Sequence, residues 1–428
     1  MKSHYLLFKQ KRFLPLFLTQ FQGALTDNLI KNMLVLTAAF EIYAKRPSLS
    51  VIVIALSGAL LMLPFFIFSA VSGQIADRFD KAFVTRFIKA FEVLLMLLAV
   101  YGFMHESVLI LLFVVFLLGT HSTFFGPIKY SILPQHLEER ELLAGNAFIE
   151  GGTFIAILLG CILGNELPIM LHMETICKGA VYVALLGACL SFTGFIISFF
   201  IPSAPSLQKD LKVDLNIVRS TKEIIAYSRE NKRVFRAIMA ISWFWLIGIT
   251  IMTLLPNFVK DFLNAAPSVY TFFLIVFTVG IAIGSILCEV ILKEKIETKY
   301  APIGGLGMTV FIILWFLLTI KYDCPANAVT LWSFIFLPYN WLFIADVLLI
   351  ALFSGFYVVP LNTLVQKLSD KSHMSRVIAS NNIFNSIYMM AGAILFTICI
   401  PAGLSIPYIL LCLGVANFIF TTLIIRQP

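Results

Sequence analysis

Residues 12–44 read RFLPLFLTQFQGALTDNLIKNMLVLTAAFEIYA, an apolar stretch with a polar middle. Its ends can lie in lipid, whereas its middle carries the side chains Gln20, Gln22, Thr26, Asp27, Asn28, Lys31 and Asn32. Ionisable side chains at membrane depth are costly, so they usually face a protein interior or a water-filled path and mark a functional site. The stretch therefore predicts a membrane helix with a functional polar face.

Asp27 and Lys31 are the charged residues in the middle of this stretch, and they are four residues apart. On a helix they share one face, with the acid nearer the N-terminus, and can form an ion pair. Gln20 and Ala24 continue the same face. Two interpretations stay open: a self-neutralised pair that packs two helices together, or a substrate or ion site in a transport cavity.

The composition of the whole chain indicates that its solvent is lipid. Of the 428 residues, 60% are hydrophobic and 13% are charged, and the mean hydropathy is +0.95, whereas a soluble domain has about 45–50% apolar and about 25% charged residues. A membrane span needs about 20 mostly apolar residues. The candidates are residues 13–42, 48–74, 82–104, 107–133, 141–166, 177–201, 234–258, 268–292, 300–320, 341–367, 374–400 and 405–426. We therefore predict an all-α polytopic membrane protein with twelve transmembrane helices.

We interpret the net charge of +8 as a signal for the orientation of the chain in the membrane rather than as a nucleic-acid-binding surface. If the N-terminus is cytoplasmic, 24 of the 31 Lys and Arg residues fall on the cytoplasmic side and five on the other. Lys31 and Lys89 lie within spans. Positively charged loops stay in the cytoplasm, so we expect both termini there. The seven cysteines are scattered and show neither a disulfide framework nor the spacing of a metal site.

The chain divides at its only long polar stretch, residues 202–233, where apolar and basic residues suggest a short amphipathic helix along the cytoplasmic face. Six predicted spans precede it and six follow. We therefore expect an N-terminal six-helix bundle (1–201), a cytoplasmic linker (202–233) and a C-terminal six-helix bundle (234–428). This is the arrangement of major facilitator transporters, which bind substrate between two related halves.

Two comparisons between the halves support an internal repeat. Pro127 precedes Asn146 by 19 residues, and Pro360 precedes Asn381 by 21 residues. The first and seventh spans should also correspond, with Gly23 opposite Gly248 and Asp27 opposite Met252. The seventh span has no charge between Arg236 and Lys260. The two halves thus differ in polarity, with the charges in the first half. This difference would suit a substrate that is charged at one end and apolar at the other.

The loop between the second and third spans reads GQIADRFDK, residues 73–81, and resembles the G-x-x-x-D-R-x-x-[RK] loop of major facilitator transporters. Gly73 would allow close helix approach. Asp77 would accept hydrogen bonds at the N-terminus of a helix from the opposite half, where the helix dipole favours an anion. Arg78 and Lys81 would meet carboxylates or lipid phosphates. The resemblance implies a latch for the outward-open state; the alternative is an ordinary cluster of positive charge.

Two further charged residues fall within or near predicted spans. Lys129 follows Pro127 and could meet a phosphate oxygen, or its side chain could simply extend to the membrane surface. Glu150 lies among glycines, one turn after Asn146. It could pair with Lys31 or Lys129, bind a substrate amine, carry a proton, or serve structure alone.

Enzyme signatures are missing from the sequence. No His is followed five residues later by Asp, as an acyltransferase of membrane lipids would require, and there is no P-loop, G-x-S-x-G or histidine metal cluster. We therefore predict no catalytic residues, no cofactor and no metal.

A more specific resemblance rests on five segments: TQFQGALTDN (19–28), GQIADRFDK (73–81), FGPIKYSIL (125–133), LLAGNAFIEGGTFIAILLG (142–160) and SGFYVVPLNTLVQ (354–366). Together they resemble the bacterial lysophospholipid transporter (LplT) branch of the major facilitator superfamily. The resemblance implies a multi-pass inner-membrane flippase that brings lysophospholipids, chiefly lysophosphatidylethanolamine, to the cytoplasmic leaflet for reacylation. It also implies a partner, an acyltransferase/acyl-carrier-protein synthetase encoded beside the transporter or fused to it.

By position, Asp27, Asn28, Lys129 and Glu150 match the polar residues of that family. The chain lacks the basic residue expected in the seventh span, where Met252 stands, and it adds Lys31, as in the branch fused to the synthetase. Our site hypothesis is alternating access around a head group. Asp27 and Glu150 would meet an ethanolamine amine and Lys31 and Lys129 a phosphate. The remaining proposed substrate-binding residues are Gln20 and Asn146.

Other functions are also compatible with these charges. One is a proton-coupled facilitator that exports amphipathic cations, with Asp27 or Glu150 as the proton carrier. Another is a membrane scaffold or sensor that anchors an acyltransferase and transports nothing. Besides the lysolipid and surrounding membrane lipids, we expect no nucleic-acid partner, and by analogy with facilitators we expect a monomer.

Overall fold

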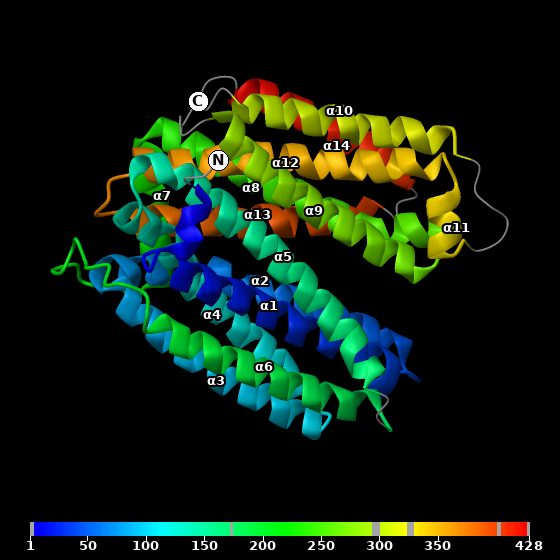
Figure 1. Ribbon diagram of the computed structural model, residues 1–428, viewed down its shortest axis with the longest axis horizontal. Helices are drawn as coiled ribbons and strands as arrows, with labels where there is room; N and C mark the ends of the chain where they lie inside the picture. Colours follow the sequence, from blue (N-terminus) through cyan, green and yellow to red (C-terminus); the bar gives the residue numbers. More distant parts are fainter. Residues whose placement is uncertain (1–3, 172–173, 293–299, 323–328, 400–403, 426–428) are drawn as a thin grey trace. The chain divides into compact units, whose positions relative to one another are not determined.

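The computed structural model describes residues 4–171, 174–292, 300–322, 329–399 and 404–425, and in these ranges it is built almost entirely of helices (Figure 1). The long helices are α1 (Leu14–Thr37), α2 (Pro47–Arg78), α3 (Lys81–Met104), α4 (Val108–His136), α5 (Leu142–Met170), α6 (Ile176–Ser198), α8 (Lys232–Asn257), α9 (Pro267–Leu292), α10 (Tyr300–Ile320), α12 (Asn340–Leu368), α13 (Met374–Cys399) and α14 (Ile406–Phe420). Shorter helical segments are η1 (His4–Lys9), η2 (Ala38–Ile42), η3 (Glu139–Glu141), α7 (Ile217–Glu230), η4 (Phe258–Phe262), α11 (Leu331–Phe336) and η5 (Thr421–Ile425).

The long helices agree with the predicted spans to within several residues at each end. Within the described ranges, ten of them are long and apolar enough to cross a membrane. The other two, α1 and α13, have polar residues in their middles: Asp27, Asn28 and Lys31 on α1, and Asn381 and Asn385 on α13. The prediction of an all-α polytopic membrane protein is confirmed.

Side-chain caps fix two of the tight junctions between helices. Asp80 is the N-cap of α3, where its Oδ1 accepts a hydrogen bond from Phe83 N at 2.8 Å. Asn231 separates α7 from α8 and accepts hydrogen bonds from Arg233 N and Val234 N at 3.1 and 3.3 Å. An N-cap satisfies backbone donors that have no partner inside the helix. These short polar residues therefore set where α3 and α8 begin.

The chain forms two compact units. Unit 1 comprises Met1–Gly145, Ile155–Glu230 and Ser369–Ser386, and unit 2 comprises Asn146–Phe154, Asn231–Leu368 and Ile387–Pro428. Each unit therefore takes a piece of α5 and of α13. The division predicted from sequence, at residues 202–233, stays a prediction.

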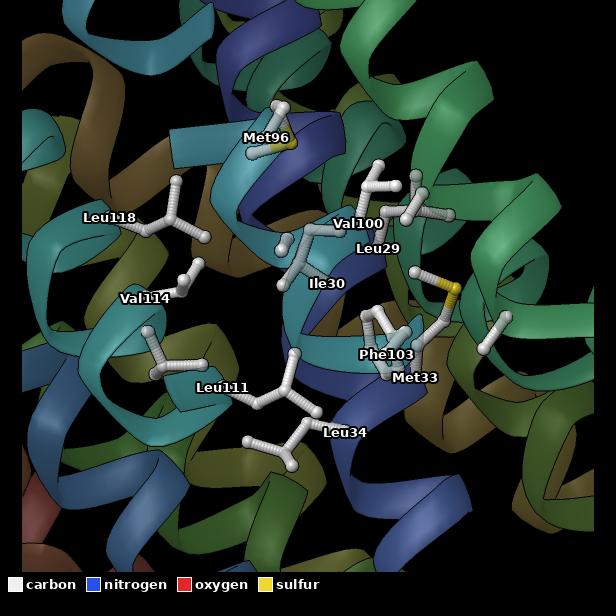
Figure 2. Packing of buried hydrophobic residues seen from close by; sticks show 14 of the residues in the cluster. Leu29, Ile30, Met33, Leu34, Met96, Val100, Phe103, Leu111, Val114 and Leu118 are labelled. Carbon is white, nitrogen blue, oxygen red and sulfur yellow. The ribbon is translucent and has the colours of Figure 1, made fainter. Parts of the chain in front are cut away.

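The apolar core of unit 1 lies among α1, α3 and α4 (Figure 2). Met33 and Leu34 of α1 are fully buried beside Phe103 of α3 and Leu111 of α4. In the same unit, α3 and α6 run side by side (Figure 1). Close packing of this kind fixes helix positions, because even one misplaced methylene is felt.

In unit 2, α12 packs against α8, α9 and α10. Glycine makes the α9–α12 contact close, since a Cβ on Gly280 would lie 2.6 Å from Ala351 Cβ and 2.8 Å from Leu348 O. Small residues bring membrane helices together in this way. The rest of the interior is aromatic, with the ring centroid of Phe258 5.1 Å from that of Trp315.

The amphipathic helix predicted in the linker is α7. Ile224 is 4% exposed and packs with Ala70 of α2 and Ile383 of α13, all within unit 1. Leu215 and Val218, two apolar residues of the same stretch, are 74% and 63% exposed. The buried stripe instead consists of Ser220, Ile224 and Ser228. Small hydroxyl residues at these positions let α7 lie close to its neighbours.

Candidate functional site

Asp27 of α1 lies inside unit 1, and its hydrogen-bond partner is on α4 of the same unit. Ser122 Oγ donates to Asp27 Oδ2, and Asp27 is 6% exposed. Asp27 Oδ1 is buried with no hydrogen-bond partner among the described residues. Within the described ranges, Asp27 forms no ion pair with half-buried Lys31, since Oδ2 bonds to Ser122 and Oδ1 to nothing. The structure therefore does not support the self-neutralised pair.

The other polar residues of α1 have different surroundings. Asn28 Nδ2 donates to Ala24 O, one turn back on its own helix, at 2.9 Å. Gln20 is 3% exposed. On α5, Gly160 makes room for α1, because a Cβ there would lie 3.0 Å from Asn28 Cβ and closer still to Leu25 O. Asn28 therefore lies at a tight helix contact.

A second and more extensive polar cluster lies next to α1, centred on Glu92 of α3. The Glu92 carboxylate accepts hydrogen bonds from Lys89 Nζ, Gln22 Nε2 (2.9 Å), Thr26 Oγ1 (2.7 Å) and Ser191 Oγ (3.1 Å). The side chains of Lys89 and Glu92 are both completely buried. A buried ion pair is stable only when further hydrogen bonds satisfy its atoms, and α1 and α6 provide them here.

His121 joins this cluster to the Asp27 site. His121 Nε2 lies 3.1 Å from Glu92 Oε2, within ion-pair distance but without hydrogen-bond geometry. The next residue along α4 is Ser122, the donor to Asp27. Gly23 lets α1 pass close by, because a Cβ there would lie 3.4 Å from Lys89 Nζ and 3.7 Å from His121 Cε1. We name Lys89, Glu92, His121, Gln22, Thr26 and Ser191 the Glu92 cluster.

Sequence reasoning did not find the Glu92 cluster. One signal was present: Lys89 and Glu92 are three residues apart inside a predicted span, a spacing that allows an ion pair on one helix face. The roles of His121, Ser122 and Ser191 had no such signal, since each is far in sequence from the carboxylate that it contacts.

The remaining predicted substrate-binding residues fall in both units. Lys129 of α4, in unit 1, has its Nζ 4.8 Å from the ring centroid of Tyr130. Glu150 of α5 belongs to unit 2 and is 3% exposed. Asn146, also in unit 2, exchanges two hydrogen bonds with Gln366 of α12, at 2.5 and 3.0 Å. That reciprocal amide pair joins α5 to α12.

The predicted latch residues meet the N-terminus of α13 within unit 1. Asp77 Oδ1 accepts a hydrogen bond from Ser375 N at 3.0 Å, and Oδ2 accepts from Arg376 N and Nε at 3.3 and 3.0 Å. A carboxylate at a helix N-terminus is favoured by the helix dipole. A Cβ on Gly73 would lie 2.7 Å from Ala379 Cβ, so Gly73 permits this approach.

The two basic residues of the motif differ in burial. Arg78 lies over the Phe79 ring, with its Cζ 5.1 Å from the centroid. Lys81 is 1% exposed and begins α3, so it is not a surface cation. The ion-pair partner of Asp77 is Arg376, whose Nε lies 3.0 Å from Asp77 Oδ2 and which lies outside the motif.

Comparison with known proteins identifies the family. The model of the Major Facilitator Superfamily matches residues 16–393. The chain belongs to the major facilitator superfamily. Among its curated relatives, the lysophospholipid transporter LplT of Photorhabdus laumondii is 25% identical over 420 residues, or 95% of this chain and 92% of that protein. LplT of Escherichia coli O139:H28 is 25% identical over 90% of this chain and 88% of that protein.

Solved structures agree on the fold of this major facilitator protein. A bacterial homologue of the iron transporter ferroportin, in its outward-facing state, has a TM-score of 0.71 at 11% identity, covering 97% of this chain and 99% of that one. The E. coli fucose:proton symporter FucP has a TM-score of 0.72 at 10% identity, with the same coverage. At such identities the likeness concerns the fold alone.

In this major facilitator protein the linker also contacts the latch residues. Gln208 Oε1 accepts a hydrogen bond from Arg376 Nη2 at 2.5 Å, and Ser206 Oγ donates to Asp77 O at 2.8 Å. Tyr227 of α7 stacks on His373, with ring centroids 4.5 Å apart. The linker therefore surrounds the contact between Asp77 and α13.

Proposed function

We propose that the protein is a lysophospholipid transporter that moves lysophosphatidylethanolamine-like lipids to the cytoplasmic leaflet of the bacterial inner membrane, by alternating access, for reacylation. The proposal is supported by relatives named as lysophospholipid transporters, which match about nine tenths of the chain. It is also supported by the charges buried in unit 1.

The observation that carries the proposal is the unequal bonding of the Asp27 carboxylate. Ser122 holds one oxygen, while the other is buried with no hydrogen-bond partner among the described residues. A buried acceptor without a partner is costly. A substrate ammonium group would satisfy Asp27 Oδ1 and form a charge-assisted hydrogen bond, which is the stronger kind.

The Glu92 cluster supports the same assignment by elimination. Glu92 is buried too, but Lys89 and three neutral donors already satisfy it. It therefore has little to offer a substrate amine. In our proposal the cluster positions α1 and α4, and Asp27 receives the head group.

A zwitterionic head group needs partners for both of its charges. In unit 1, Asp27 would meet the amine and Lys31 and Lys129 the phosphate, while Gln20 and Asn28 complete the polar lining. Glu150 and Asn146 of unit 2 stay predicted substrate-binding residues, with Glu150 suited to an amine. The acyl chain would lie against apolar side chains or extend into lipid. Paired protein charges would offset the cost of removing the head group from water.

The Asp77 contact would serve as the conformational latch. Its hydrogen bonds to Ser375 and Arg376 would hold the outward-open state and break when the transporter opens to the cytoplasm. A cytoplasmic acyltransferase/acyl-carrier-protein synthetase would then consume the delivered lysolipid, so we propose such an enzyme as the functional partner.

Uptake of labelled lysophosphatidylethanolamine into proteoliposomes tests the assignment. Asp27→Ala and Glu150→Ala should each lose most of the wild-type rate, whereas Asp210→Asn, an exposed change in the linker, should not. Wild-type uptake by both site variants would refute the assignment. Ser122→Ala should reduce uptake less than Asp27→Ala, because it leaves the carboxylate in place.

Lys31→Ala separates this function from the export of amphipathic cations. A lysolipid carries a phosphate and needs a cationic partner, whereas a cationic substrate does not. We expect Lys31→Ala to slow lysolipid uptake. Unchanged lysolipid uptake together with proton-driven export of a lipophilic cation would favour the exporter instead.

A further inference from the structure

A second unsatisfied carboxylate, Asp346, lies in unit 2, far in sequence from every residue of the proposed head-group site. It belongs to α12 and is 2% exposed. Neither Oδ1 nor Oδ2 has a hydrogen-bond partner among the described residues. An ionised carboxylate in such surroundings is strongly disfavoured, so the acid is neutral there or meets a cation.

Among the side chains that the structure describes, the elements packed against α12 supply Asp346 with no ion-pair partner. The titratable side chains on them and on α12 itself are Lys232, Arg233 and Arg236 of α8, Lys260 and Asp261 of η4, Tyr270, Cys288 and Glu289 of α9, Tyr322 and Tyr339 beside Phe343, and Tyr357 and Lys367 of α12. Ala301–Ile320 of α10 has none. Within the described part of the chain, Asp346 bonds to no member of this set.

Helical spacing places Asp346 on the face of α12 that carries Phe353 and Tyr357, seven and eleven residues later. That face meets α10, because the rings of Phe353 and Phe311 lie 5.6 Å apart, and a Cβ on Gly304 would lie 2.7 Å from Tyr357 N. One turn before Asp346, the ring of Phe343 lies 5.5 Å from that of Phe258. Asp346 thus lies on the face of α12 that packs against α10, among apolar and aromatic side chains. We call this contact between α12 and α10 the seam.

The described His, Cys, Asp and Glu side chains give Asp346 no set of partners for a divalent cation. Calcium and magnesium require about six oxygen ligands, and the only group of three metal-ligating side chains within the described ranges is Glu41, Glu106 and Cys177. Asp346 is not part of that group. A proton, in contrast, needs one carboxylate oxygen and no further ligand atoms.

We propose that Asp346 is a proton-binding site, which holds a proton while α12 is packed in this arrangement and exchanges it with water when transport opens the seam. One proton would bind from the water on one side of the membrane and leave on the other. The coupling to lysolipid movement rests on the proposed transport function; the presence of a bound proton does not.

Infrared difference spectroscopy of the purified full chain in lipid nanodiscs, with no lysolipid present, tests the bound proton. The spectrum of the wild type minus that of Asp346→Asn should contain the carbonyl band of a protonated carboxylic acid at neutral pH. Asp346→Glu should keep such a band at a shifted frequency. Asp261→Asn, an exposed acid of the same unit, should give no difference in that region. A flat difference spectrum for Asp346→Asn would overturn the proposal.

Transport in proteoliposomes tests the coupling. A pH gradient should change wild-type uptake of lysophosphatidylethanolamine severalfold. The ratio of uptake with the gradient to uptake without it should fall to about one in Asp346→Asn. Asp346→Glu and Asp261→Asn should keep the wild-type ratio. A wild type that ignores the gradient, or an Asp346→Asn variant that still responds to it, would overturn the coupling. Wild-type protein with no uptake under any condition would refute the transport function itself, and the infrared band would still decide whether Asp346 holds a proton.

Discussion

Helices α1 and α8 begin the two halves of the chain and satisfy their buried polar groups in different ways. On α1, Gln22 and Thr26 donate to Glu92 of another helix. On α8, Ser242 and Thr250 donate to carbonyl oxygens four residues back, at 2.9 and 2.8 Å. Gln22 and Thr26 thus join α1 to a charged group of another helix, whereas the hydrogen bonds of Ser242 and Thr250 to those carbonyl groups lie within α8.

This difference indicates where a polar substrate can be recognised. A network between helices fixes side chains in place, and fixed charges are what recognition of a head group needs. On α8, Trp243 Nε1 donates a hydrogen bond to Asn417 Oδ1 at 2.9 Å, which is a contact between neutral groups. We therefore expect changes in the Glu92 cluster to be far more damaging than changes on α8.

The largest effect should come from Glu92→Gln. It removes the anion and leaves the Lys89 ammonium buried, which costs about 3–5 kcal/mol for a broken buried pair. We expect a large drop in the thermal unfolding midpoint, measured by fluorescence-detected size exclusion after heating. The matched control is Glu174→Gln, which breaks the exposed pair with Lys178. Exposed pairs contribute about 0–1 kcal/mol, so a Glu92 variant as stable as this control would contradict the network.

A double variant sharpens the same test. Lys89→Met with Glu92→Leu removes both charges, and apolar replacement of a complete buried pair is often neutral. We expect it to regain much of the stability that Glu92→Gln loses. Failure to regain any would mean that the neutral hydrogen bonds of the cluster matter more than its charges.

The next largest effect is expected for Asp77→Ala. Hydrogen bonds to a charged group contribute about 1.5–3 kcal/mol, and this change removes those made with Ser375 and Arg376. The variant should lose uptake and show faster labelling of a cysteine introduced near the N-terminus of α13. Asp210→Ala in the exposed linker should do neither; unchanged uptake in Asp77→Ala would count against the latch.

Gly23 and Gly248 give a direct comparison of the two helices. A Cβ on Gly23 meets Lys89 and His121, whereas one on Gly248 has nothing within 4 Å. Gly23→Leu should therefore destabilise by about 1–3 kcal/mol, the usual cost of overpacking, while Gly248→Leu should leave the melting temperature near that of the wild type. Equal destabilisation by both would remove the packing distinction between α1 and α8.

The smallest effect should be a pH response at the start of α7. Hydrogen bonds from the Arg219 side chain, at 2.5 Å, and from Asn216 N hold the pKa of Asp214 below its usual value. A lowered folded-state pKa stabilises above the unfolded pKa, about 4, and the benefit disappears as pH falls through the folded value. The hydrogen-exchange protection of residues 214–230, corrected for the intrinsic pH dependence of amide exchange, should fall slightly in acid, and Asp214→Asn should abolish that change.

Sequence patterns predicted the helices better than they predicted the side-chain partners. Apolar runs identified α2, and the polar residues 202–233 located α7, because hydropathy and length are local properties. The partner of Asp27 was not local. Lys31 is one turn away, yet the hydrogen-bond partner is Ser122, 95 residues along the chain.

The sequence by itself determined a polytopic helical chain, the polar middle of α1 and the Asp77 loop, because the cost of placing polar groups in lipid acts residue by residue. Only the tertiary structure decided that four donors bond to Glu92, and that Asp27 Oδ1 and both Asp346 oxygens have no hydrogen-bond partner among the described residues. The physical reason is the short distance over which a hydrogen bond forms. A buried charge is satisfied by whatever packing brings within about 3 Å, and contacts at glycines such as Gly23 set that packing between helices distant in sequence.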